Sequence, residues 1–295
     1  MVIFKPKKFG FVIKRSVSKA TKLAIEVADW LEKHGCEVVV ADESTIFQRK
    51  RPNTQTLPKD QLPTAVDMVI VFGGDGTFLS IARQMIWKSV PILGVNLGRL
   101  GFLTEVKVEE VYETLELVLK GKYQVQERSM LEACVKRAGR ELFCLPVLND
   151  VVVGKSAIAR VIDFQLRLNG VLVATLKADG LIVATPTGST AYALAAGGPI
   201  VHPKVGGTVI AAICPHSLNV RPLVIPEESA IEIELLQKDG DIMLTLDGQF
   251  GYELHLGDII SVTKYKRHTV QVVQSPKRDY FELLRTKLYL GARGE

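Results

Sequence analysis

The chain has 295 residues, of which 47% are hydrophobic and 23% charged, a composition that excludes an intrinsically disordered protein. Its net charge of +5 is mildly basic. The Arg and Lys residues do not cluster in a stripe, and this argues against a module that binds duplex nucleic acid. Small polyanions such as nucleotides remain suitable ligands. The length suits two domains, each with its own core.

The sequence predicts neither a signal peptide nor a membrane span. Residues 1–8 lack the apolar stretch of a signal peptide. No run of apolar residues approaches the roughly 18 that a membrane span needs. We therefore expect a soluble, cytoplasmic protein that does not bind membranes.

The four cysteines and five histidines show no metal-binding spacing, since neither C-x-x-C nor H-x-x-x-H occurs. Cys134 and Cys144 are placed symmetrically about Gly139, and a hairpin at this point would set them opposite each other. In a reducing compartment we expect both to be thiols.

The first 125 residues alternate between strand and helix patterns. Apolar runs predict strands at residues 9–14, 36–41, 68–72 and 91–96. Spacings of 3.6 residues predict helices at residues 16–34, 77–87 and 106–120. Three prolines indicate a long surface loop over residues 42–63. This alternation predicts an α/β domain with a parallel sheet flanked by helices, which binds ligands at the carboxyl ends of its strands.

From about residue 129 the apolar period changes to two, which predicts a β-rich domain. Its strand patterns fall at residues 161–176, 230–237, 242–246, 258–263 and 269–274. Asn169-Gly170 predicts a two-residue hairpin turn within the first of these segments. Residues 277–290 form one apolar helical face, which we expect to pack back onto the first domain. The predicted divisions are residues 1–125, 126–275 and 276–295.

A glycine-rich loop, Gly73-Gly74-Asp75-Gly76-Thr77, follows the strand at residues 68–72 and precedes a helix. Such a turn offers backbone N–H groups to a phosphate. It matches neither the Walker loop nor G-x-G-x-x-G. Asp75 has two interpretations: a helix cap, which Asp favours, or a functional carboxylate. Among arriving phosphates a carboxylate weakens binding unless it acts on a metal or a hydroxyl, so we favour the second.

Two further loops are rich in small residues. Residues 94–102 end the next strand and include Phe102, which is either a core side chain or a platform for a nucleobase. Residues 185–192 combine hydroxyl side chains with a glycine and leave room for a close-fitting ligand. In isolation, Asn149-Asp150 and Asp247-Gly248-Gln249 are typical of turns.

Taken together, these motifs resemble those of the bacterial NAD kinases, and the resemblance covers nearly the whole chain. The glycine-rich loop alone is weak evidence, because phosphofructokinases and lipid kinases carry similar loops. The order and spacing of the full set are specific. That set comprises Gly73-Gly74-Asp75-Gly76-Thr77, Gly98 with Phe102, Asn149-Asp150, Asp179-Gly180, the block 185–192 with Gly197-Gly198-Pro199, Arg221-Pro222 and Asp247-Gly248-Gln249.

The resemblance implies roles for individual residues. Asp75 corresponds to the catalytic base that acts on the 2′-hydroxyl of the adenosine ribose, with Gly76 beside it. Asn149 and Asp150 correspond to the pair that holds the adenosine part of NAD, and Phe102 to an aromatic residue that packs on adenine. Further ligand contacts are implied at Arg160, Lys177, Asp179, Thr190, Ala191, Tyr192, Ala195 and Gln249.

The same resemblance implies the reaction and its cofactors. NAD kinases transfer a phosphoryl group from ATP to NAD and give NADP, and they use Mg²⁺ or another divalent metal, whose protein ligands the sequence does not identify. Lys177 stands where ATP-restricted members carry a basic side chain, so we expect ATP rather than inorganic polyphosphate as donor. Family members are usually dimers or tetramers whose site a neighbouring subunit completes, which implies a homo-oligomer.

Two alternatives remain open. A lipid or sphingoid-base kinase shares the glycine-rich loop and a β-rich second domain, but the block 185–192 and Asn149-Asp150 argue against it. A non-catalytic dinucleotide sensor would not need Asp75. Formation of NADP from NAD and Mg-ATP separates both alternatives from a NAD kinase.

Overall fold

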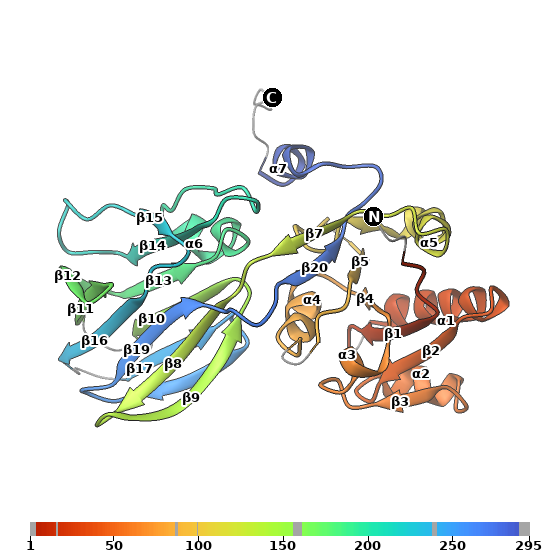
Figure 1. The fold of residues 1–295 in the computed structure, drawn as a ribbon, viewed down its shortest axis with the longest axis horizontal. Helices are drawn as coiled ribbons and strands as arrows, with labels where there is room; N and C mark the ends of the chain where they lie inside the picture. Colours follow the sequence, from red (N-terminus) through yellow and green to blue (C-terminus); the bar gives the residue numbers. More distant parts are fainter. Residues whose placement is uncertain are drawn as a thin grey trace. The chain divides into compact units, whose positions relative to one another are not determined.

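The computed structural model describes residues 4–15, 17–85, 88–98, 100–155, 161–237 and 241–288. The chain divides into two compact units (Figure 1). The first comprises Met1–Glu127 with Val270–Glu295, and the second comprises Arg128–Thr269. Within the described residues no helix has the length and apolar character needed to cross a membrane.

The first unit is built around a mainly parallel sheet. The strand order is β3-β2-β1-β4-β5-β20-β7. A further short strand, β6, also pairs with β5. The strands are β1 (Lys8–Ile13), β2 (Glu37–Ala41), β3 (Gln55–Leu57), β4 (Met68–Phe72), β5 (Ile92–Asn96), β6 (Val106–Lys107), β7 (Val125–Arg128) and β20 (Val270–Val273). The strands β1, β2, β4 and β5 are almost wholly buried, which explains their continuous apolar sequences.

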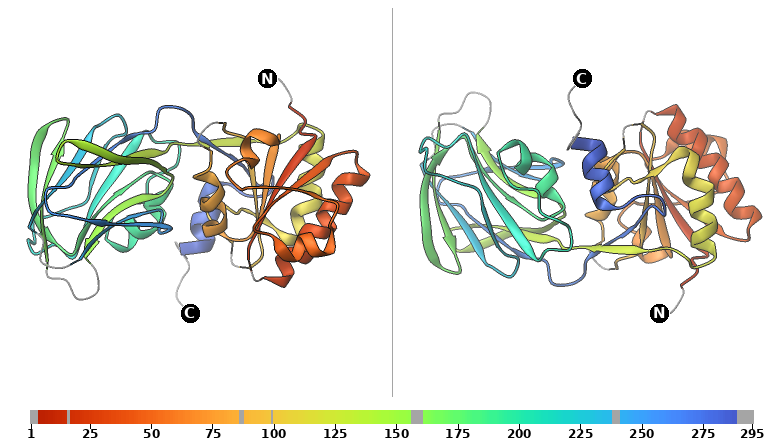
Figure 2. Two further views of the ribbon diagram at one scale, coloured as in Figure 1. Left: turned by 90° about the horizontal axis from the view of Figure 1, so that it is seen from below. Right: turned by 90° about the horizontal axis from the view of Figure 1, so that it is seen from above.

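Helices cover both faces of this sheet. They are α1 (Ser18–Lys33), α2 (Thr45–Lys50), α3 (Leu62–Ala65), α4 (Asp75–Ala82), the 3₁₀ turn η1 (Val108–Glu110), α5 (Val111–Leu119) and α7 (Tyr280–Leu288). Helices α1 and α5 lie on one face, and α4 and α7 lie on the other (Figure 2). The predicted return of the C-terminal helix to the first unit is confirmed, because α7 belongs to it.

Two details of the first unit differ from the sequence analysis. The predicted long loop at residues 42–63 contains α2, β3 and the start of α3, because Phe47 and Leu62 are fully buried and anchor it. The strand pattern at residues 269–274, assigned to the β-rich domain, is β20, and it pairs in parallel with β5 of the first sheet.

The second unit is the predicted β-rich domain and contains two antiparallel sheets. One sheet has the order β15-β14-β13-β10-β17-β18, and the other β12-β11-β16-β19-β8-β9. Alternate residues of both sheets share one core, as in a sandwich. The strands are β8 (Leu131–Arg137), β9 (Arg140–Val147), β10 (Asp150–Lys155), β11 (Ile162–Leu168), β12 (Val171–Ala178), β13 (Gly180–Ala184), β14 (Gly207–Ile213), β15 (Leu223–Pro226), β16 (Ile231–Gln237), β17 (Ile242–Leu246), β18 (Phe250–Leu254) and β19 (Ile259–Lys264).

Short turns set the register of this unit. Asn169 and Gly170 have φ angles of 51° and 79°, the left-handed conformations that a tight hairpin turn requires, and they join β11 to β12 as predicted. The turn after β13 carries a 3₁₀ turn, η2 (Gly188–Thr190), and the helix α6 (Tyr192–Ala195).

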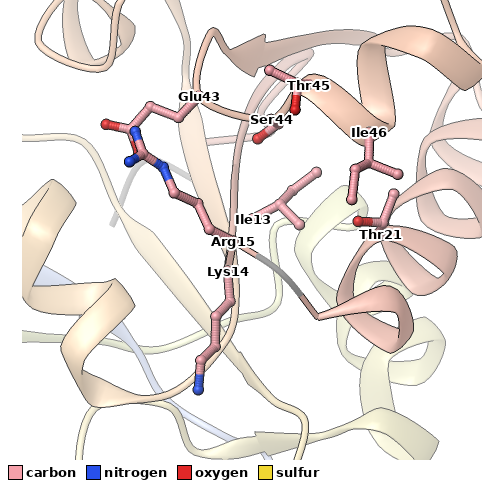
Figure 3. A pocket seen from close by; sticks show the side chains of 8 residues that line it. All are labelled: Ile13, Lys14, Arg15, Thr21, Glu43, Ser44, Thr45 and Ile46. Carbon is pink, nitrogen blue, oxygen red and sulfur yellow. The ribbon is translucent and has the colours of Figure 1, made fainter.

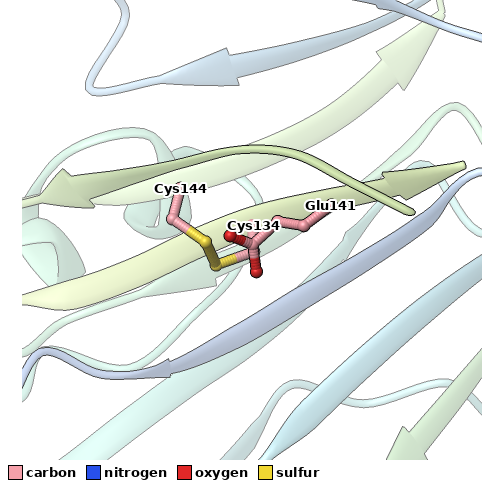
Figure 4. A group of neighbouring side chains, drawn as sticks. All are labelled: Cys134, Glu141 and Cys144. Carbon is pink, nitrogen blue, oxygen red and sulfur yellow. A yellow bond between two sulfur atoms is a disulfide. The ribbon is translucent and has the colours of Figure 1, made fainter. Parts of the chain in front are cut away.

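The hairpin predicted around Gly139 is formed by β8 and β9, with Cys134 directly opposite Cys144. The expectation that these two residues are thiols is wrong, because the structure joins them in a disulfide (Figure 4). Their Cα atoms are 4.1 Å apart, since paired residues on adjacent antiparallel strands approach closely.

Candidate functional site

The glycine-rich loop lies at the point in the first sheet where the strand order reverses. Strand β1 pairs with β2 on one side and β4 on the other, and the loop follows β4 directly. In open α/β sheets this reversal opens a crevice at the carboxyl ends of the strands, where ligands bind. The loop is therefore placed where the alternating pattern predicts a ligand.

Asp75 is the first residue of α4, but its side chain does not cap that helix. Its carboxylate instead accepts hydrogen bonds from three consecutive backbone N–H groups: Phe102 to Oδ2 at 2.9 Å, and Leu103 and Thr104 to Oδ1 at 3.1 Å each. The Thr104 hydroxyl donates a further bond to Oδ1 at 3.1 Å. Since Oδ1 accepts three bonds and Oδ2 only one, Oδ2 is the oxygen with remaining capacity to accept a proton.

Gly101 permits this approach. A Cβ atom at that position would lie 1.9 Å from Asp75 Oδ1, a distance that no side chain allows. The glycine at position 101, in the loop of residues 94–102, is thus explained by the passage of its backbone over the carboxylate.

Phe102 and Lys287 lie beside Asp75. The Phe102 ring is 9% exposed, and its centroid lies 6.4 Å from that of Tyr280. The Lys287 Nζ lies 4.6 Å from the centre of the Phe102 ring and 3.8 Å from Asp75 Oδ2. Sequence reasoning missed Lys287 and Tyr280. The predicted return of the C-terminal helix was the signal that could have placed them here.

In the second unit, Asp247 holds Asn149 and Asp150, although its sequence context is typical of a turn. The Asp247 carboxylate accepts hydrogen bonds from the backbone N–H groups of Leu148 at 3.1 Å, Asn149 at 2.6 Å and Asp150 at 3.2 Å. A carboxylate therefore clamps three consecutive N–H groups here, as Asp75 does in the first unit.

The block 185–192 packs against the same segment. The Thr185 hydroxyl donates to the Leu148 carbonyl at 2.6 Å, and the Thr185 N–H donates to the Asn149 carbonyl at 2.9 Å. A Cβ atom on Gly188 would lie 2.0 Å from the Asn149 carbonyl oxygen, so this position requires glycine. The small residues of the block are therefore explained by close backbone contact with Asn149.

Two features of this segment indicate ligand binding. The Asn149 Oδ1 atom is buried and has no hydrogen-bond partner among the described residues. Asp150 is 5% exposed, and burial raises its pKa from 3.8 to about 7. The charge of Asp247 adds to this rise, which a hydrogen bond from the Tyr192 N–H opposes. Near neutral pH the Asp150 carboxyl can therefore act as either donor or acceptor to a hydroxyl.

Other residues predicted to contact the ligand lie at the same end of the second unit as Asn149 and Asp150, and Gly76 lies in the first unit. Thr190 donates its hydroxyl to the Thr187 carbonyl at 3.2 Å. Ala191 precedes α6, while Tyr192, 47% exposed, and Ala195 lie on it. Gln249 is exposed in the turn between β17 and β18, next to Asp247. Gly76 is the second residue of α4 in the first unit.

Lys177 and Asp179 do not join this group. Asp150 pairs with Ala184 at one end of β10 and β13, whereas Gly154 pairs with Gly180 at the other end, next to Asp179. These ends are about 14 Å apart at roughly 3.4 Å per residue. Asp179 forms an ion pair with Lys155 at 2.8 Å, and Lys177 one with Asp163 at 3.6 Å. Arg160 lies outside the described residues.

Among the described residues, the three metal-ligating side chains that lie close enough to share an ion are Cys134, Glu141 and Cys144 (Figure 4). The two sulfur atoms are bonded to each other, and Mg²⁺ takes oxygen ligands in octahedral geometry. This donor set does not fit Mg²⁺.

Comparison with known proteins covers both units. Residues 9–123 match the family model of the ATP-NAD kinase N-terminal domain, and residues 148–275 match that of the C-terminal domain. The chain is 46% identical to the NAD kinase of Syntrophotalea carbinolica over 97% of this chain and 100% of that protein. It is 45% identical to the NAD kinase of Geobacter sulfurreducens, with the same coverage.

Two solved structures share the fold. Yeast NADH kinase, solved with NADH, superimposes with a TM-score of 0.92 at 25% identity, over 99% of this chain and 90% of that one. An NAD kinase from Archaeoglobus fulgidus, solved with ATP, gives 0.73 at 25% identity, over 95% and 98% of the two chains. With both domain models matched and relatives identical at nearly half of all positions, the chain belongs to the NAD kinase family.

Proposed function

We propose that the protein transfers the terminal phosphoryl group of ATP to the 2′-hydroxyl of the adenosine ribose of NAD, giving NADP and ADP. The observation that carries this proposal is the match to NAD kinases along nearly the whole chain. The geometry around Asp75 and Asn149 supports it. The first unit binds phosphates and the second binds the adenosine of NAD.

In this reaction the ribose 2′-oxygen bonds to the γ-phosphorus while the bond to the ADP oxygen breaks. Phosphoryl transfer has a loose transition state, so positioning and charge neutralisation contribute most of the rate. The hydroxyl proton is accepted late in the transfer by Asp75 Oδ2. The other oxygen of that carboxylate is held by Leu103 and Thr104, which fixes the orientation of the base.

Adenosine is recognised by the segment that Asp247 clamps. The unpartnered Asn149 Oδ1 accepts a hydrogen bond from the ligand, and the Asp150 carboxyl bonds a ribose hydroxyl. Phe102 stacks on adenine. Because its ring is 9% exposed and Lys287 lies over it, Lys287 must move aside for stacking. Thr190, Ala191, Tyr192, Ala195 and Gln249 line the ligand at the same end of the second unit.

Asp179 lies just before β13, at the end opposite to Asn149, and Lys177 lies on β12 of the other sheet. This separation from Asn149 supports a homo-oligomer in which Lys177 and Asp179 serve the site of a neighbouring subunit. Arg160 is assigned to the same ligand by family resemblance. The donor is ATP rather than inorganic polyphosphate, and a divalent metal accompanies its phosphates. The enzyme acts in the cytoplasm.

The test is direct. Purified protein, Mg-ATP and NAD are mixed, and NADP is measured with an NADP-specific dehydrogenase. Omission of the metal and replacement of ATP by polyphosphate test the two cofactor assignments. Turnover of a lipid without NADP formation would favour a lipid kinase, and NAD binding without turnover would favour a sensor.

A further inference from the structure

Figure 3 shows a hollow of about 370 Å³ at the carboxyl ends of β1 and β2. Because β1 runs parallel to β4, this hollow opens on the same edge of the sheet as the glycine-rich loop and belongs to the ligand crevice described above. A different group of side chains, Cys134, Glu141 and Cys144, lies in the second unit on the hairpin of β8 and β9 (Figure 4). None of these three residues is assigned a part in binding NAD or ATP.

The three side chains share the outer face of their sheet. Ala133 and Val135, the neighbours of Cys134 along β8, both belong to the core of the second unit, so Cys134 points to the opposite face. Cys144 lies directly opposite Cys134, and the hairpin brings the two together although they are 10 residues apart in the chain. Their sulfur atoms and a Glu141 carboxylate oxygen all lie within 4.8 Å of one another.

A β-bulge places Glu141 beside the cysteines. Glu141 and Cys144 are three residues apart, and an uninterrupted strand would turn them to opposite faces. The register of the hairpin shifts here, so that Lys136 lies opposite Glu141 rather than Leu142. The extra residue returns Glu141 to the face of the cysteines. Bulges re-aim side chains in this way, and no local spacing in the sequence reveals the resulting group.

The surroundings leave Glu141 available as a ligand. It is exposed, and no hydrogen bond or ion pair engages its carboxylate among the residues that the structure describes. Lys136 is the charged residue that faces it in the register, and a nearby ammonium group favours thiolates over thiols. On the other side of β8, the uncharged Ser261 of β19 lies opposite Cys134.

Two sulfur atoms and one carboxylate oxygen select a thiophilic ion. Zn²⁺ takes thiolate sulfur at about 2.3 Å and carboxylate oxygen at about 2.0–2.2 Å in tetrahedral geometry, which sets its ligand atoms about 3.5–3.8 Å apart. That separation lies within the spread of the group once the two sulfur atoms are no longer bonded to each other. Hard ions such as Mg²⁺ and Ca²⁺ prefer oxygen ligands. A water molecule completes the tetrahedron on the exposed side.

The disulfide is the form that cannot bind the ion, because its sulfur atoms are not thiolates. A dithiol reductant opens it. The reductant is oxidised to a disulfide, and its two electrons and two protons pass to the sulfur atoms of Cys134 and Cys144. Zn²⁺ then displaces these two protons as it binds. Reduction is therefore the step that creates the site.

We infer that the reduced hairpin of β8 and β9 is a zinc site, with Cys134, Glu141 and Cys144 as its protein ligands, and that the disulfide is its oxidised, metal-free state. Strand β9 is an edge strand of its sheet, and in both states a cross-link ties it to β8. The inference goes beyond the proposed function and does not depend on it, since the ion lies on a hairpin with no residue assigned to NAD or ATP.

Metal titration of the full-length protein tests the assignment. The protein is reduced with a phosphine, and a thiol assay checks that Cys134 and Cys144 have become thiols like Cys36 and Cys214. Zn²⁺ added in competition with a chromogenic chelator should then bind at one ion per chain, whereas the oxidised protein should bind none. Co²⁺ in place of Zn²⁺ should give the near-ultraviolet absorption of thiolate coordination.

Variants separate this site from the other thiols. Cys134→Ser should abolish zinc binding and lose the thiolate absorption. Glu141→Gln, an exposed change that keeps both cysteines, should weaken zinc binding about tenfold or more, since even the partners of metal ligands contribute about 10–100-fold. The matched controls are Cys214→Ser, at the exposed free cysteine, and Glu127→Gln, at an exposed carboxylate on β7. Both controls should bind zinc as the wild type does.

Thermal unfolding gives a second readout that does not depend on turnover. Zinc should raise the Tm of the reduced protein by an amount that grows with its concentration, and a chelator should reverse the rise. Equal binding by the oxidised and reduced proteins, or unaltered binding in Cys134→Ser, would refute the inference. So would a disulfide that the phosphine does not open in the folded protein. NADP formation is measured separately, and its absence would end the proposed function while leaving the zinc site intact.

Discussion

The Asp75 carboxylate accepts a hydrogen bond from the backbone N–H of Phe102 at 2.9 Å, so one contact joins the proposed catalytic base to the proposed adenine platform. Together with the hydrogen bonds from Leu103 and Thr104, this contact makes Asp75 the anchor of the segment that follows β5, residues 97–104. Replacing Asp75 therefore has two separable consequences: loss of a base, and release of the segment that carries Phe102.

Asp75→Asn should lower the single-turnover rate by about 10²–10⁴-fold, the usual contribution of a positioned general base. The amide oxygen can still accept bonds from Leu103 and Thr104, but the NH₂ group then faces the Phe102 N–H and one bond is lost. We expect NAD affinity, measured by calorimetry, to survive in large part. A near-normal rate would show that another group takes the proton, and an affinity loss as large as the rate loss would make Asp75 an anchor only.

Phe102→Leu should weaken NAD binding by about 1–3 kcal/mol if the ring stacks on adenine. Leucine is preferred to alanine because it fills most of the buried volume next to Tyr280 and so protects the fold. Calorimetric titration with NAD gives the affinity, and urea unfolding checks that stability is retained. Unchanged affinity in a stable variant would identify Phe102 as a core residue.

Asp150 should make the protein less stable as the pH rises from about 4 to about 7. Its pKa is raised by burial from 3.8 to about 7 in the folded state, so the folded chain binds the proton more tightly than the unfolded chain across this window. The free energy of unfolding then decreases with pH and becomes independent of Asp150 above pH 7. Asp150→Asn, which imitates the neutral acid, should remove this part of the pH dependence. Urea unfolding of both proteins between pH 4.5 and pH 8 measures the difference, and parallel curves would contradict the raised pKa.

Gly188→Ala should disrupt the adenosine-binding segment, because the new methyl group would lie 2.0 Å from the Asn149 carbonyl oxygen, a backbone atom that cannot turn away. We expect a loss of about 1–3 kcal/mol of stability and a fall in NAD affinity. Gly251→Ala is the matched control in the same unit, since its methyl group would meet only the flexible end of Met243 at 3.5 Å. Similar behaviour of the two variants would mean that the block 185–192 does not position Asn149.

The sequence by itself determined the fold class, the apolar face of the C-terminal helix and the positions of most elements, because these depend on local patterns. Continuous apolar runs identify β4 and β5 as strands buried on both faces, and Asn169-Gly170 identifies a hairpin through its left-handed angles. The motifs also led to the family, since their order along the chain is itself a property of the sequence.

Only the tertiary structure decided which groups act together. No local pattern brings Asp247 to the N–H groups of Leu148, Asn149 and Asp150, nearly a hundred residues away along the chain, or Lys287 to Asp75. The same holds for β20, whose strand pattern is plain but whose sheet is chosen by the available edge of β5. Charge, burial and pairing partners arise from contacts between distant segments. These contacts determine which oxygen of Asp75 accepts fewer hydrogen bonds and why the pKa of Asp150 is raised to about 7.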